Sequence, residues 1–155
     1  MVDIDGSIAS WKKRAEKAGV MPCRSKLEHF QAWLDAVQNE KSLSEDEPII
    51  PVVETVLSLR QQGHTVVFLT GRSEIYREVT EAWITHHLFI KQPAVFMRGK
   101  SDYRSAAAYK RDKLTIILEN SEEKFVMAID DDHDGDMADV YNELGIVHLK
   151  VMGIL

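Results

Sequence analysis

Two aspartates near the amino terminus, Asp3 and Asp5, carry the clearest chemical signal in the chain. Their spacing turns both carboxylates toward one face of extended backbone, and Gly6 after them permits a sharp turn close to a ligand. One carboxylate of such a pair can attack phosphorus in line, while the other protonates the leaving oxygen and later takes a proton from water. The pair therefore suits phosphoryl transfer, although an Asx-turn at a strand end uses the same residue types.

A second acidic run, Asp130-Asp131-Asp132, directly follows an apolar stretch that reads as a buried strand. Like charges in that position are costly unless a cation neutralises them, and carboxylates facing a phosphate would repel it. Hard oxygen ligands favour Mg²⁺. We therefore predict a magnesium site with Asp130 as a ligand. The alternative is a solvated acidic loop, which Asp134 and Asp136 would extend.

Two further features could bind a phosphoryl group. Thr70-Gly71-Arg72 follows a long apolar run and offers a hydroxyl, backbone N–H groups beside a flexible residue, and a guanidinium that can grip two oxygens. Lys110, near the start of a later helix, is placed to supply a counter-charge to a nucleophile and to phosphoryl oxygens. Each has a simpler interpretation: the triplet as an ordinary N-cap and turn, and the lysine as a solvated residue.

These residues fall at strand ends or helix starts of one alternating series of strands and helices. We expect strands over 64–70, 94–97, 125–129 and 146–151, with residues 2–5 as the end of a first strand. Helices are expected within 11–40, from Pro51 to Gly63, over 75–86 and 106–118, and from Met137 to Leu144. Such alternation predicts the α/β class, with a doubly wound parallel sheet of Rossmann type. Ligands of such sheets bind beyond the carboxyl ends of the strands.

The 155 residues fit a single domain over 1–155, with a small helical insert over about 11–48. The insert's apolar side is expected to hold Trp11, Phe30, Trp33, Leu34 and Val37, and residues 44–48 are expected to form a loop. These patterns predict no particular oligomeric state.

Composition and net charge indicate the cellular compartment and the kinds of partner to expect. Hydrophobic residues make up 45% of the chain, no apolar run is long enough to cross a bilayer, and the single cysteine, Cys23, cannot form an internal disulfide. We therefore expect a cytoplasmic protein without a membrane partner, in which Cys23 is a structural or idle thiol. The net charge of -6 argues against indiscriminate binding of nucleic acid, although basic clusters around Arg14 and around Arg98 could guide a phosphate-bearing substrate.

The ordered set DxDG[ST], TGR, a lysine and DD resembles the haloacid dehalogenase superfamily of aspartate-dependent phosphatases, and the four motifs span most of the chain. The resemblance implies a HAD-like fold with Asp3 as nucleophile and Asp5 as general acid and base. It makes Thr70 and Lys110 the phosphoryl ligands. Mg²⁺ would be held by Asp3, Asp130 and the Asp5 carbonyl, with Asp131 assisting.

Within that superfamily the chain is similar to the phosphatase domain of bacteriophage polynucleotide kinase/phosphatase, through Arg14, Gly71-Arg72 and the segments after Arg98 and Lys110. This finer resemblance implies removal of 3′-phosphates from DNA or RNA ends. It also implies substrate binding by a set of residues at the site: Arg14, Gly71, Arg72, Arg98 and Arg104.

Two features depart from the pattern. Ala106 stands where related sequences often carry an aspartate before the lysine, so any contribution of that carboxylate is absent. Only Met1 and Val2 precede Asp3, which makes the first strand very short. No Gly-x-x-x-x-Gly-Lys-[Ser/Thr] occurs, so the chain contains no partner kinase.

Other functions stay open at this point. The motifs fix the reaction but not the leaving group, so a small-molecule or nucleotide phosphatase is the nearest alternative. A receiver-type phospho-acceptor domain uses similar residues, but it carries its acceptor aspartate near the middle of the chain, whereas here Asp3 and Asp5 come first and Asp130 last. A binding protein that keeps the fold without turnover is more remote, and measuring phosphate release would separate it from the enzymes.

Overall fold

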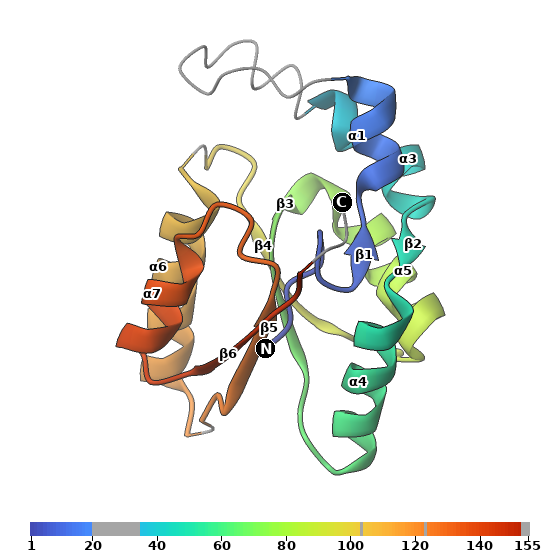
Figure 1. Cartoon of the computed structure of the whole chain (residues 1–155). Helices are drawn as coiled ribbons and strands as arrows, with labels where there is room; N and C mark the ends of the chain where they lie inside the picture. Colours follow the sequence, from blue (N-terminus) through green and yellow to red (C-terminus); the bar gives the residue numbers. More distant parts are fainter. Residues whose placement is uncertain (20–34, 103, 123, 153–155) are drawn as a thin grey trace.

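The computed structural model describes residues 1–19, 35–102, 104–122 and 124–152 (Figure 1). Part of the expected insert, including Phe30, Trp33 and Leu34, lies outside the described residues. Within the described ranges, no helix is both long and apolar enough to cross a membrane. In chain order the elements are β1 (Ala9–Ser10), α1 (Lys12–Ala18), α3 (Glu40–Ser44), β2 (Glu47–Pro48), α4 (Ile50–Gln61), β3 (Val67–Ser73), the 3₁₀ helix η1 (Glu74–Tyr76), α5 (Arg77–Leu88), β4 (Ala94–Arg98), α6 (Ala106–Asn120), β5 (Met127–Asp130), α7 (Met137–Glu143) and β6 (Val147–Lys150).

Parallel strands form the centre of the fold. β3 pairs with β4 and β5 pairs with β6, both in parallel. Residues 1–3 lie between the two pairs, because Val2 N–H donates to the Val67 carbonyl at 2.9 Å and Asp3 N–H donates to the Ile129 carbonyl at 2.9 Å. The predicted α/β class is confirmed. A continuous doubly wound sheet and a helical insert stay predictions, since the first strand contributes only isolated bridges at Val2.

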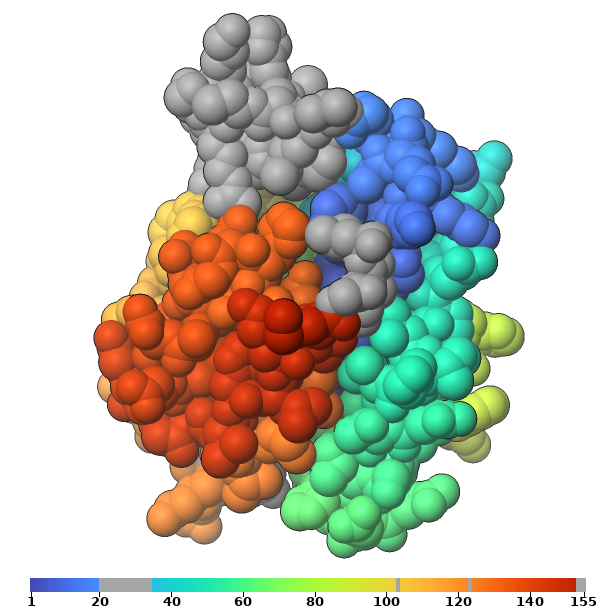
Figure 2. Space-filling view, viewed as in Figure 1, coloured from blue at the N-terminus to red at the C-terminus, as the bar shows by residue number. Residues whose placement is uncertain are grey.

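Helices pack against both sides of these strands (Figure 1). One core cluster joins α4 and α5 to Phe68 and Ile129, and a second joins α6 and α7 to Leu69 and Ala128. Neighbouring strand residues enter different clusters because successive side chains of a strand point to opposite faces. The face seen in Figure 2 likewise carries the segments after about residue 125 (orange to red) on one half and α4 on the other.

Two local expectations were wrong. Thr70 does not end its strand, since β3 continues to Ser73 with an irregular register between Leu69 and Ser73. The expected loop over 44–48 contains the end of α3 and strand β2, which pairs antiparallel with β1.

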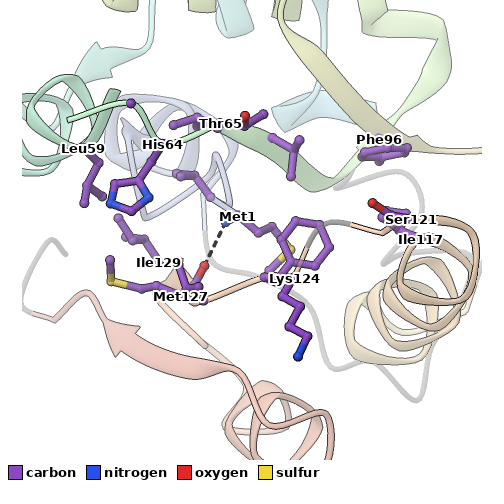
Figure 3. A pocket seen from close by; sticks show the side chains of 16 residues that line it. Met1, Leu59, His64, Thr65, Phe96, Ile117, Ser121, Lys124, Met127 and Ile129 are labelled. Atoms are coloured by element: carbon purple, nitrogen blue, oxygen red, sulfur yellow. Dashed lines mark hydrogen bonds between the residues drawn. The ribbon is translucent and has the colours of Figure 1, made fainter. Parts of the chain in front are cut away.

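A cavity of about 410 Å³ lies at the amino ends of the parallel strands (Figure 3). Its walls include Val67 and Met127, the first residues of β3 and β5, together with residues just before each strand. The Met1 ammonium lies here and donates to the Met127 carbonyl at 2.8 Å, and burial lowers its pKa to about 6. Asp3 and Asp130 belong to the opposite edge, where the strands end, so the cavity does not contain them.

Candidate active site

Four predicted residues meet at the carboxyl ends of the central strands. The Lys110 ammonium lies 2.9 Å from Oδ1 of Asp3 and 2.7 Å from Oδ2 of Asp130. One carboxylate oxygen from each of Asp3, Asp130 and Asp131 lies within 4.8 Å of the other two. Strand pairing explains the meeting, because Asp3 follows the bridge at Val2 while Asp130 ends β5 beside it. The structure therefore brings the first and last acidic motifs together.

The carboxylates of Asp3, Asp130 and Asp131, which we call the carboxylate cluster, carry more negative charge than the single Lys110 ammonium beside them can balance. Burial raises the pKa of Asp3 well above its usual range, and the charge of Asp130 acts in the same direction against Lys110. Burial and the neighbouring Asp130 also raise the pKa of Asp131 to about 6. For Asp130 itself burial is outweighed by the charge and hydrogen bond of Lys110, so its pKa is lowered. One ammonium thus faces three carboxylates, an imbalance that a divalent cation would correct.

The donor set fits Mg²⁺. Its members are hard carboxylate oxygens, they converge on one point, and two of them are almost fully buried. Asp3, Asp130 and Asp131 are the side chains that would hold the ion. The Asp5 carboxylate does not join them.

A tight turn between Asp3 and Ala9 sets the position of Asp131. Gly6 has a φ of +82°, a conformation that glycine adopts without cost, and its N–H donates to the Ala9 carbonyl. A Cβ on Gly6 would lie 2.2 Å from Oδ2 of Asp131. The buried Ser7 hydroxyl accepts a hydrogen bond from the Asp131 N–H at 2.9 Å. Gly6 and Ser7 of the DxDG[ST] motif therefore position Asp131 of the DD motif.

Asp5 belongs to a separate network with two arginines. Nε of Arg72 donates to Oδ2 of Asp5 at 2.9 Å, and Arg14 donates to Oδ1 of the same carboxylate. Burial raises the pKa of Asp5, but the charges of Arg72 and Arg14 outweigh it and hold the pKa well below its usual range. Asp5 is therefore ionised in this arrangement.

Sequence reasoning missed the fourth member of this network, Asp46. Its carboxylate accepts from Nε of Arg14 at 2.7 Å and from a terminal nitrogen of Arg72 at 2.8 Å, and its side chain is 1% exposed. Two buried cations are thus balanced by Asp5 and Asp46 in what we call the arginine network (Arg14, Arg72, Asp5 and Asp46). Asp46 lies in an acidic run that reads as a solvated loop, so nothing local reveals its burial.

The remaining predicted residues lie along β3, β4 and the start of α6. The Thr70 hydroxyl is buried and accepts from the Arg72 N–H at 3.2 Å. Gly71 lies beside Arg98 and Ala106, since a Cβ there would be 3.4 Å from the Arg98 guanidinium. Arg98 donates to the Arg104 carbonyl at 2.7 Å, and its own Nε has no hydrogen-bond partner among the described residues.

Arg104 is not brought into the carboxylate cluster. Its exposed side chain forms ion pairs with Asp102 and Asp112 instead. Of the predicted substrate-binding residues, Gly71, Arg72 and Arg98 therefore lie at the strand ends, while Arg104 lies at the surface.

Comparisons with known proteins identify similar folds and related sequences. Two solved structures share the fold, a Pnkp1/Rnl/Hen1 complex and a Pnkp1/Rnl/Hen1 RNA repair complex, each with a TM-score of 0.69 and 23% identity over 97% of this chain. The chain covers 43% and 40% of those chains. A protein of Oceanobacillus iheyensis named as a nucleotidase is 34% identical over 73 residues, which are 46% of this chain and 38% of that protein.

A family model described as the polynucleotide kinase PNKP phosphatase domain matches residues 34–153, most of the chain. The matched range contains the TGR motif, Lys110 and the Asp130-Asp131 pair. The chain therefore belongs to the family of polynucleotide kinase PNKP phosphatase domains, within the haloacid dehalogenase superfamily of phosphatases.

Proposed function

We propose that this chain is a Mg²⁺-dependent phosphomonoesterase that removes 3′-phosphates from polynucleotide ends. The observation that carries the proposal is that the carboxylates of Asp3, Asp130 and Asp131 converge, with the Lys110 ammonium between the first two. A nucleophilic carboxylate, a cation site and a fixed ammonium are the groups that phosphoryl transfer requires. Family membership supports the reaction, and the RNA repair complex among the similar folds supports an RNA end as one substrate.

In the proposed reaction Asp3 attacks phosphorus, and the bond from phosphorus to the leaving oxygen breaks. Asp5 gives that oxygen a proton, then takes one from the water that attacks the aspartyl phosphate and returns Asp3 to its free form. Lys110 and Thr70 hold the phosphoryl oxygens. A magnesium ion held by Asp3, Asp130 and Asp131 would supply positive charge for the oxygens of the transferred group.

The arginine network adds one requirement to this reaction. Asp5 is ionised while Arg14 and Arg72 both donate to it, so it has no proton to give. A substrate phosphate that draws a guanidinium toward its own oxygens would weaken this hold and let Asp5 bind a proton. Arg14 and Arg72 would then bind substrate as the family resemblance implies, and Arg98 beside Gly71 would contact the polynucleotide backbone.

The substrate can be tested by comparing phosphate release from three kinds of compound. We expect kcat/KM to be highest for 3′-phosphorylated oligonucleotides, at least about tenfold above 5′-phosphorylated oligonucleotides and free mononucleotides, a difference of ~1.4 kcal/mol in transition-state binding. Excess chelator should abolish release, and added Mg²⁺ should restore it. RNA and DNA versions of the same oligonucleotide give the sugar preference.

A nucleotide phosphatase is the second candidate, favoured by the similarity to a protein named as a nucleotidase. Fastest release from mononucleotides would establish it and reject the polynucleotide substrate. Undiminished release in excess chelator would reject the metal site for both candidates.

Substitution of Gly6 tests whether the first turn positions Asp131. Gly6→Ala puts a Cβ 2.2 Å from the Asp131 carboxylate, whereas Gly135→Ala, at a φ of +81°, meets nothing within 4 Å. Both changes should cost roughly 1–2 kcal/mol of stability through the left-handed backbone. Only Gly6→Ala should also lower kcat/KM, by about 100-fold, because it displaces a metal ligand. Denaturant unfolding and phosphate release measure the two effects, and equal activity in both variants would reject the role of the turn.

A further inference from the structure

Tyr141 is a buried residue whose hydroxyl reaches the carboxylate cluster. It lies on the inner side of α7 and donates to Oδ2 of Asp130 at 2.6 Å. Its ring packs against His148 of β6 with ring centres 4.9 Å apart, and the Ile146 N–H donates to its carbonyl at 2.8 Å. An ionised carboxylate can only accept hydrogen bonds, so the tyrosine hydroxyl is the donor in this contact. By its spacing from Met137 and Leu144, Tyr141 is expected only to lie on the apolar side of the last helix.

The donors around Asp130 divide its two oxygens into different roles. An ionised carboxylate has about four lone-pair positions, two on each oxygen. On Oδ2 one is used by the Lys110 ammonium at 2.7 Å and the other by Tyr141. On Oδ1 one is used by the Asp132 N–H at 2.8 Å. Among the residues that the structure describes, these donors leave a single position open, and it belongs to Oδ1.

This division has a consequence for the choice of cation. A carboxylate that binds through both oxygens holds the ion at an angle well below a right angle. Ca²⁺ accepts that geometry, whereas Mg²⁺ requires nearly octahedral coordination. An Asp130 that can offer only Oδ1 suits Mg²⁺ better.

We propose that Tyr141 is a positioning residue that keeps Asp130 a one-oxygen ligand and so favours Mg²⁺ over Ca²⁺ at the carboxylate cluster. The proposal rests on the proposed function, because it takes Asp130 as a ligand of the metal. Residues that hydrogen-bond to a metal ligand fix its orientation, and their substitution commonly lowers metal affinity by about 10- to 100-fold.

Tyr109 provides a matched control. It is a second buried tyrosine, on α6 next to Lys110, and its hydroxyl has no hydrogen-bond partner among the described residues. Both Tyr141→Phe and Tyr109→Phe keep the ring and remove one hydroxyl. Only the first frees a lone pair on Asp130.

Titration calorimetry of the full chain with MgCl₂ and with CaCl₂ tests the proposal, together with melting curves in the presence and absence of each salt. We expect Tyr141→Phe to weaken Mg²⁺ binding about tenfold or more and Ca²⁺ binding less, so that the ratio of the two affinities falls. The melting temperature of this variant should accordingly rise less with Mg²⁺ than that of the wild type. Tyr109→Phe should leave both affinities unchanged.

Unchanged Mg²⁺ affinity in Tyr141→Phe, or an equal loss for both cations, would overturn the role of Tyr141. A wild type that binds Mg²⁺ and releases phosphate beside such a variant would leave the proposed function standing. A wild type that binds neither cation would instead overturn the metal site itself, and the role of Tyr141 with it.

Discussion

Asp3→Asn is expected to lower kcat for phosphate release by at least about 10⁴-fold while leaving the protein folded. The amide has almost the same shape as the carboxylate but is a poor nucleophile, so no aspartyl phosphate can form. Because burial raises the pKa of Asp3, the folded state binds its proton more tightly than the unfolded state does. The ionised form therefore costs stability at neutral pH, and a neutral side chain removes that cost. The melting temperature should stay the same or rise.

The matched control is Asp139→Asn, an exposed aspartate in the first turn of α7, which should keep wild-type turnover. Rapid quenching of the wild type during turnover, followed by mass spectrometry of the peptide that contains Asp3, should find a phosphoryl adduct that the variant lacks. Turnover near the wild-type rate in Asp3→Asn would remove Asp3 from the chemistry and with it the proposed mechanism. Loss of activity accompanied by unfolding would contradict the expected stability.

The elements of the fold were predictable because their causes are local. Apolar runs of strand length and helical periodicity lie within a few residues of one another, so β3, β4, β5 and the helices α4 to α7 follow from the sequence. The meeting of Asp3, Asp130 and Lys110 was also predictable, since parallel strands end at one edge of a sheet. The roles of these residues in catalysis stay predictions.

The partners of these residues were not predictable, because they depend on contacts between distant segments. Asp46 stands among charged neighbours typical of a loop, and only the arrival of Arg14 and Arg72 makes its burial tolerable. Tyr141 has the spacing of an ordinary core residue, and its hydrogen bond to Asp130 depends on where the fold places α7 relative to the last residue of β5. A buried tyrosine hydroxyl usually has a hydrogen-bond partner, although that of Tyr109 has none among the described residues. The residue type was therefore a signal, but it did not identify the partner.

Arg72→Met is expected to lower the free energy of unfolding by about 3–5 kcal/mol, the usual cost of removing one partner from a buried ion pair. Arg72 is 0% exposed and donates to both Asp5 and Asp46. Without it Arg14 alone faces two carboxylates, and methionine fills much of the volume without supplying charge. Denaturant unfolding measures the loss. Arg77→Met, which breaks half-exposed ion pairs with Glu74 and Glu81, should cost about 1 kcal/mol or less.

A second substitution separates the effect of charge from that of packing. Asp46→Asn added to Arg72→Met leaves one cation and one anion, Arg14 and Asp5, so the double variant should be more stable than Arg72→Met alone. The deficit of the single variant should also shrink at low pH. As the pH falls, the wild type loses the stability that comes from the lowered pKa of Asp5. In the variant, protonation of a carboxylate at low pH removes the negative charge that Arg72 no longer balances.

Activity should not follow stability in this double variant. If Arg72 binds the substrate phosphate, phosphate release stays low even where the fold is recovered, because the balanced network still lacks the guanidinium that the phosphate would draw away from Asp5. Recovery of turnover together with stability would show instead that Arg72 serves the fold alone. A double variant no more stable than Arg72→Met would mean that packing, not charge, makes this arginine necessary.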